Sequence, residues 1–88
     1  MSFPGKIQSY MAAGKPIVAS LNGEAARIIT EAECGFVSHA EDVEGLVSCI
    51  EKLIGADKAV LGKNARDYYE KNFQKEDFIK NLLEILAE

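Results

Sequence analysis

The short apolar run at residues 17–19 (IVA) constrains the fold of this chain more than any other feature. An apolar run without polar alternation is typical of a strand that is covered on both faces, as in parallel sheets. Just before it, Gly14 can adopt the left-handed conformation that ends a helix, and Pro16 prevents the helix from continuing. We therefore predict a helix over residues 5–13, a tight turn and then a buried strand.

The alternation of helix and strand continues after this run. Residues 20–23 (SLNG) form a turn in which Asn22 or Gly23 tolerates a positive φ. A helix over about residues 23–33 follows, and residues 35–38 (GFVS) are predicted as a second strand. A strand–helix–strand segment of this length forms a right-handed crossover with two parallel strands.

The second half of the chain is predicted to be three helices. The first begins at the acidic pair Glu41-Asp42, which favours a helix start, and closes at Gly55. The others cover residues 57–72 and the segment from about Lys75 to the end. The fold class is therefore α/β, a partial Rossmann-like three-layer unit in the order α-β-α-β-α-α-α with a short parallel sheet.

The predicted helices carry apolar residues with helical spacing. In chain order the apolar positions are Ile7, Tyr10, Met11 and Gly14; Ala26, Ile28, Ile29 and Ala32; Val43, Leu46, Val47, Ile50, Leu53 and Ile54; Val60, Leu61, Ala65, Tyr68 and Tyr69; and Phe78, Ile79, Leu82, Leu83 and Leu86. The tyrosine pair and the last helix are most simply core, and alternatively a partner interface.

Two parallel strands make a thin sheet, because three or more strands are usually needed for independent stability. We expect the sheet to belong to a wider one or to be completed by another copy. An edge strand with unpaired backbone groups is a template for pairing. Homo-oligomerisation through the sheet edge or the last helix is therefore an open alternative.

Composition excludes several classes of protein. The 88 residues suffice for one small domain, and their net charge of −4 argues against nucleic acid as a main ligand. No apolar run approaches the roughly 20 residues that span a bilayer, and no signal peptide is visible at the start. We therefore expect a cytoplasmic protein. Cys34, Cys49 and the single His39 do not form a zinc-binding pattern, so we expect reduced, buried thiols, with a disulfide or a metal site as the alternative.

The first candidate site is the turn at residues 3–6 (FPGK), which precedes a helix. Free backbone N–H groups and the helix dipole at such a start bind anions. Lys6 would add a positive charge for a diphosphate. The simpler interpretation is that Pro4 only starts the helix and that Lys6 is solvated.

The second candidate site is residues 22–24 (NGE), after the first strand. Ligands of open α/β sheets bind beyond the carboxyl ends of the strands. Glu24 either contacts the hydroxyls of a sugar or ribose, or compensates the helix dipole. His39 follows the second strand and is more simply a surface residue than a catalyst. The sequence contains no GxGxxG fingerprint, Walker loop or nucleophile elbow.

Four patterns together resemble a known family. They are P-x-K-I-x-x-Y-M-A-A-G-K-P-I-V-A-S…G-E at residues 4–24, E-C-G-F-V at 33–37, D-V-E-x-L at 42–46 and N-A-R-x-Y-x-E-x-N-F at 64–73. They resemble retaining glycosyltransferases of the GT-B architecture, of the group 1 or family 4 type. The resemblance covers nearly the whole chain and implies a truncated C-terminal donor-binding subdomain, residues 1–88, of an enzyme several times longer.

The resemblance also implies roles for individual residues. It places residues 3–6 beside the donor diphosphate and residues 13–16 (AGKP) at the turn into the strand. Many members of the family carry two glutamates with seven residues between them, which would fall at Met1 and Ser9 here. Neither glutamate is present, although Ser9 can donate a hydrogen bond. The implied donor-binding residues are Gly5, Lys6, Ser9 and Glu24, with no catalytic residue, metal or cofactor.

The implied parent reaction moves a hexose or amino-hexose from a nucleotide-diphosphate-sugar to a glycan or lipid-linked acceptor, as in polysaccharide assembly. Such a parent would associate peripherally with a membrane. We expect no sugar transfer by this chain alone, because the acceptor-binding domain and the cations for the leaving diphosphate are missing. Two alternatives are a non-catalytic α/β interaction module and a fragment of a nucleotide-sugar epimerase.

Overall fold

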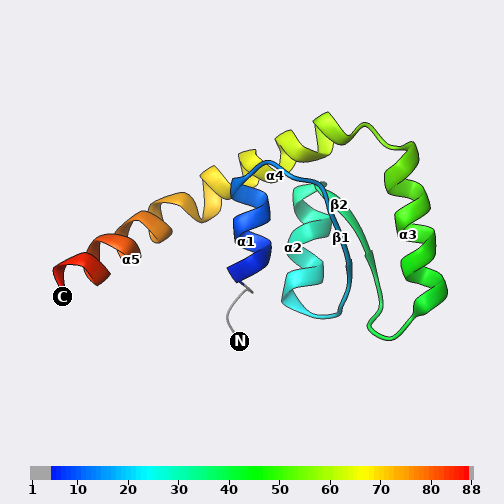
Figure 1. The fold of residues 1–88 in the computed structure, drawn as a ribbon, viewed down its shortest axis with the longest axis horizontal. Coiled ribbons are helices and arrows are strands. Elements are labelled where there is room, and N and C mark those ends of the chain that lie inside the picture. The colour runs from blue at the N-terminus through cyan, green and yellow to red at the C-terminus, as the bar shows by residue number, and fades with distance from the viewer. Residues whose placement is uncertain (1–4, 88) are drawn as a thin grey trace.

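The computed structural model describes residues 5–87 and confirms the predicted order of elements. The elements are α1 (Gly5–Ala12), β1 (Ile17–Ser20), α2 (Glu24–Ala32), β2 (Gly35–Ser38), α3 (Val43–Gly55), α4 (Lys58–Asn72) and α5 (Gln74–Leu86) (Figure 1). Most predicted bounds lie within one or two residues of these. The expectations for Met1, Phe3 and Pro4 fall outside the described residues.

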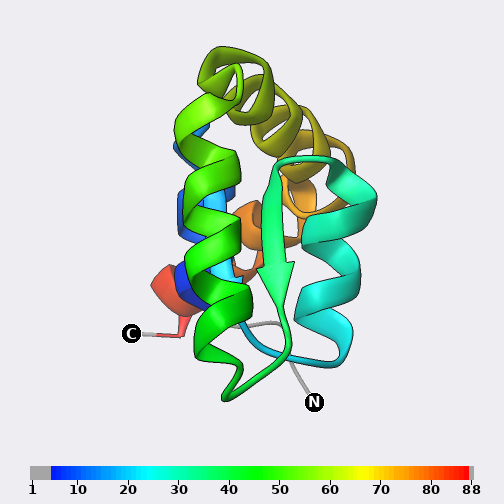
Figure 2. The same ribbon diagram turned by 90° about the vertical axis from the view of Figure 1, so that its right-hand side faces the viewer.

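The two strands form the predicted parallel sheet. Ile17 pairs with Gly35 and Ser20 with Ser38, so both strands end at the same edge. Helix α2 covers one face of this sheet and α3 covers the other, which gives the three layers (Figure 2). The fold class predicted from the sequence is therefore confirmed.

Glycine is required where the strands meet. A Cβ atom on Gly35 would lie 1.7 Å from the carbonyl oxygen of Ile17, so any larger residue would force the strands apart. Gly14 has the left-handed φ of 69° that the sequence predicted at the end of the first helix. The corresponding position after α2 is Glu33, with φ 54°.

The core is formed mainly by α1, β1 and α2, and α4 contributes one buried residue to it. Its buried members are Ile7, Met11, Ile17, Ala25, Ile28, Ile29, Ala32, Cys34 and Ala65. Tyr68, Tyr69 and Phe73 pack against this cluster, which confirms the two tyrosines as part of the core region. Cys34 and Cys49 are buried and unpaired, as expected, and burial raises the pKa of the Cys34 thiol.

The apolar faces of α3 and α5 do not enter the core, so the interpretation of the last helix as core is wrong. Helix α3 buries only Cys49, and α5 buries no residue. Tyr10 of α1 is also exposed. The large apolar side chains left exposed in these three helices are Tyr10, Val43, Val47, Ile50, Ile54, Phe78, Ile79, Leu82, Leu83, Ile85 and Leu86. The cause in α5 is its position, because it continues away from α4 along the long axis of the molecule (Figure 1).

Candidate functional site

The carboxyl ends of the strands and several helix starts gather at one edge of the molecule. β1 and β2 end there, and α1, α2 and α3 begin there (Figure 1). The β1–α2 and β2–α3 turns are tied together by side chains. Asn22 Oδ1 accepts a hydrogen bond from the Ala40 N–H at 3.3 Å and lies 3.3 Å from His39 Nδ1. Ser20 Oγ donates to the carbonyl oxygen of His39 at 3.0 Å. This edge therefore has a connected polar rim.

A groove with a cavity volume of about 380 Å³ lies on this rim. It is lined by Leu21, Asn22, Gly23, Ala26, Thr30, Val37, Ser38 and His39. Gly23 has a φ of 82° and precedes α2, and within residues 5–87 no side chain caps this helix start. Backbone N–H groups at such a start attract negative charge. His39 is exposed and hydrogen-bonded, as expected of a surface residue.

Glu24 is the first residue of α2 and its side chain is about half exposed. Its carboxylate forms an ion pair with Arg27, and Oε1 accepts from Arg27 Nε at 2.9 Å. This hydrogen bond lowers the pKa of Glu24, and the same pair raises the pKa of Arg27. Arg27 also donates to Glu31, which accepts from the Tyr68 hydroxyl at 2.7 Å. Glu24 is therefore an ionised acceptor whose orientation is supported by its neighbours.

The structure separates the four predicted donor-binding residues. Gly5 and the exposed Lys6 begin α1 at the same edge as the start of α2, where Glu24 lies. Ser9 lies instead in a second groove between α1 and α5, with a cavity volume of about 270 Å³. This groove is lined by Gln8, Ser9, Ala12, Tyr69, Asp77, Lys80 and Asn81. This groove was not predicted, because α1 and α5 are more than 60 residues apart in the sequence.

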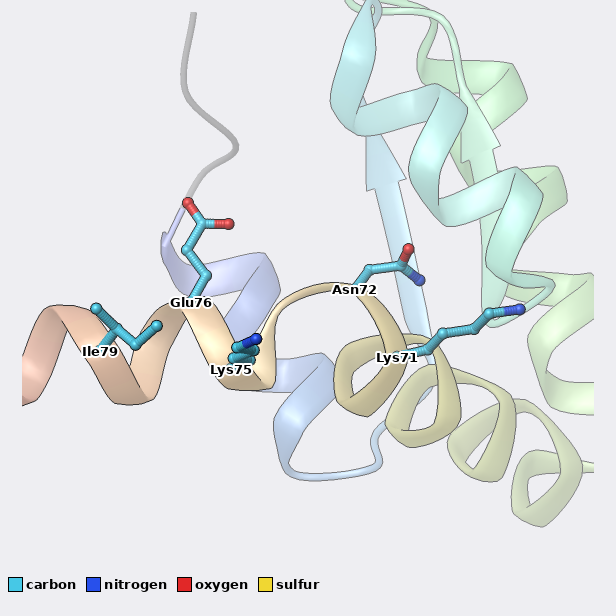
Figure 3. Close-up of a pocket in the computed structure, with 5 residues that line it drawn as sticks. All are labelled: Lys71, Asn72, Lys75, Glu76 and Ile79. Atoms are coloured by element: carbon cyan, nitrogen blue, oxygen red, sulfur yellow. The ribbon is translucent and has the colours of Figure 1, made fainter.

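A third hollow lies where α4 meets α5. It has a cavity volume of about 380 Å³ and is lined by Lys71, Asn72, Lys75, Glu76 and Ile79. Lys71 and Lys75 point in different directions and do not converge on a common point (Figure 3). This hollow is also away from the strand ends, so we do not assign it a role.

Two kinds of feature are not found in residues 5–87. None of their helices combines the length and apolar character needed to cross a membrane. In the same part of the chain no three His, Cys, Asp or Glu side chains are grouped so that they could hold a metal ion.

The fold and the edge define a class of protein. A parallel sheet with helices on both faces, whose helix starts meet the carboxyl ends of the strands, is the arrangement of Rossmann-like ligand-binding units. Comparison with protein families makes this assignment specific. The family described as glycosyl transferases group 1 matches residues 1–56 of the 88-residue chain. The chain therefore belongs to the group 1 glycosyltransferases.

The matched segment corresponds to a continuous part of the fold. It covers every element from α1 to α3, including both strands and the edge described above. Comparison with curated proteins and with solved structures gave no match.

Proposed function

We propose that this chain is part of the donor-binding domain of a group 1 glycosyltransferase and that its strand-end edge binds a nucleotide-diphosphate-sugar. The observation that carries the proposal is the meeting of two helix starts with the ends of two parallel strands, in a chain that belongs to this family. Helix starts favour phosphate because their N–H groups and dipole face the anion. The donor diphosphate would lie at the start of α1, beside Gly5 and Lys6.

Glu24 would contact the sugar hydroxyls from the start of α2. A carboxylate accepts hydrogen bonds but donates none, so it suits hydroxyl groups. Arg27 keeps this carboxylate ionised, as the lowered pKa of Glu24 indicates. The two helix starts would then divide the donor between them, with phosphate at α1 and sugar at α2.

We propose binding without sugar transfer for this chain alone. Retaining transfer needs stabilisation of the departing diphosphate and an acceptor held against the reacting sugar. Arg27 is already neutralised by Glu24 and Glu31. The complete enzyme would move a hexose or amino-hexose to a glycan or lipid-linked acceptor. Measured transferase turnover by the pure chain would contradict this part of the proposal.

Calorimetric titration tests the binding. We expect uridine- or guanosine-diphosphate hexoses to bind the chain, and the free hexoses not to bind. Lys6→Gln should weaken binding severalfold, because it removes a positive charge beside the phosphates. Lys52→Gln, at an exposed position in the last turn of α3, is the matched control and should leave the affinity unchanged. Absence of binding, or equal effects of the two variants, would contradict the proposal.

A second candidate function is a non-catalytic module that associates with its own copies. The exposed apolar side chains of α3 and α5 favour it, because large exposed apolar patches mark interaction sites. A flat donor titration together with concentration-dependent sedimentation would support this candidate over donor binding.

A further inference from the structure

We propose that the groove at the strand ends holds an N-acyl amino group of the donor sugar, and that Asn22 and His39 recognise this group. The inference rests on the proposed function, which places the sugar at the start of α2. It narrows the donor to nucleotide-diphosphates of N-acylated amino sugars. The two residues come from the β1–α2 and β2–α3 turns, which meet at this groove.

The groove opens beside the place proposed for the sugar. Gly23 lines the groove and is followed directly by Glu24, the carboxylate proposed to contact the sugar hydroxyls. The cavity volume of about 380 Å³ leaves room for a substituent larger than a hydroxyl group. A sugar held at the start of α2 would therefore be able to place a side group in this groove.

The hydrogen bonds of the rim fix the orientation of the Asn22 amide. The Ala40 N–H donates to Asn22 Oδ1 at 3.3 Å, so the atom at this position is the oxygen. The amide nitrogen Nδ2 carries two N–H donors and makes no hydrogen bond within residues 5–87. Asn22 therefore contributes a free donor to the groove that it lines.

The same contact determines which nitrogen of His39 can accept a hydrogen bond. His39 Nδ1 lies 3.3 Å from Asn22 Oδ1, and because this oxygen only accepts, Nδ1 carries the proton. In a neutral imidazole the other nitrogen, Nε2, is then an acceptor. Within the part of the chain that the structure describes, Nε2 has no partner. The groove thus has an acceptor on His39 beside the donor on Asn22.

A secondary amide matches this lining. Its carbonyl oxygen accepts a hydrogen bond, which suits Asn22 Nδ2, and its N–H donates one, which suits His39 Nε2. The alkyl part of the acyl group would cover the apolar side chains of Leu21, Ala26 and Val37, which also line the groove. A protonated amino group has no acceptor for Asn22 Nδ2, and a hydroxyl group has no alkyl part. The lining therefore favours an acetamido group over either.

A purely structural role for Asn22 and His39 makes a different prediction. The two residues would then only join the two turns, as Ser20 Oγ also does by donating to the carbonyl oxygen of His39. In that case a change at Asn22 would lower the stability of the edge and would affect all donors alike. The experiment therefore compares two sugars that differ only in the substituent at C2.

We would titrate the full chain with glucose and with N-acetylglucosamine, each carried on uridine or guanosine diphosphate. For the nucleotide that binds, the N-acetyl sugar should bind about tenfold more tightly, as expected for two neutral hydrogen bonds whose gains are partly offset. This comparison uses the unmodified chain, so it needs no variant to fold.

Two variants test the lining of the groove. Ala26→Leu would fill the groove from α2, and the ratio of the two affinities should fall to about one. Asn22→Asp would keep Oδ1 as the acceptor for Ala40 and replace the free donor by a second acceptor, so the ratio should fall here too. Ala59→Leu, at an exposed position of α4, is the matched control for Ala26→Leu and should keep the tenfold ratio.

The outcomes separate this inference from the proposed function. Equal binding of the two sugars to the unmodified chain would overturn the acyl pocket and leave the donor site standing. A tenfold ratio that persists in both Ala26→Leu and Asn22→Asp would overturn the assignment to this groove. If neither sugar nucleotide binds, both proposals fail.

Discussion

The first half of the chain buries its apolar side chains, whereas the helices α3 and α5 leave most of theirs exposed. Eight of the nine residues in the core cluster lie between Ile7 and Cys34, and the ninth is Ala65 of α4. Helices α3 and α5 have equally regular apolar spacing, yet most of their large apolar side chains are exposed. Apolar periodicity therefore shows that a helix has a face to cover, but it does not show what covers that face.

Helix α4 belongs with the first half in this comparison. Arg66 Nη1 donates to the carbonyl oxygen of Ala12 at 2.6 Å, and Asn64 Nδ2 donates to that of Glu33 at 2.8 Å. These bonds attach α4 to the ends of α1 and α2. The proposed donor-binding edge thus lies on the well-packed region. Helix α5 packs on α4 and buries no residue of its own.

The largest expected effect comes from the contact between the strands. Gly35→Ala should destabilise the chain by about 4 kcal/mol or more, because the new methyl group would clash with the Ile17 carbonyl. Gly55→Ala is the control in α3, where an added Cβ meets nothing within 4 Å. Urea unfolding followed by circular dichroism measures both. Similar losses of unfolding free energy in the two variants would contradict the difference in packing between the two regions.

The next largest effect is the difference in stability between truncating a buried and an exposed side chain. Ile29 is fully buried, and Ile29→Ala should cost about 3 kcal/mol. Leu83 of α5 is 60% exposed, and Leu83→Ala should change the free energy of unfolding by less than about 0.5 kcal/mol. The same urea experiment tests this pair. A large loss for Leu83→Ala would show that α5 is packed in solution.

The pH dependence of stability should also differ between a glutamate in the packed region and one on α3. The Tyr68 hydroxyl and the Arg27 guanidinium lower the pKa of Glu31 below its usual 4.5. The stabilisation from Glu31 is therefore present above the pKa of the unfolded chain and is lost as pH falls through the folded one. Glu31→Gln should reduce the loss of stability between about pH 5 and pH 3. Glu51→Gln, at an exposed position of α3, should leave that loss unchanged, and a reversed order would contradict the assignment.

The smallest effect on stability is expected on the surface of α5. Leu83→Glu combined with Leu86→Glu should reduce binding of the dye ANS, because the double variant removes exposed apolar area. Its melting temperature should stay within a few degrees of the original. A large fall in melting temperature would indicate that this face is covered.

The sequence predicted the elements well because their causes are local. The helix end at Gly14, the buried strand at residues 17–19 and the acidic start at Asp42 each depend on neighbouring residues. Asp42 Oδ1 accepts from the Gly45 N–H at 2.9 Å, which explains that start in detail. The left-handed Glu33 was missed because glycine is the usual residue for that conformation.

The site was predicted only in part, because its geometry depends on distant segments. Gly5, Lys6 and Glu24 were identified by their places at helix starts. Ser9 was placed beside the same ligand, but its surroundings depend on α5, which the sequence could not position. The ion pair of Glu24 with Arg27 has helical spacing and was in principle readable from the sequence.

The central claim is that donor binding belongs to the strand-end edge. Amide chemical shifts of the chain, recorded during titration with a uridine- or guanosine-diphosphate hexose, test it most directly. The account predicts shifts at residues 5–9 and 20–26, with little change in α5. Shifts confined to α3 and to residues 82–86, or no shifts at all, would contradict it.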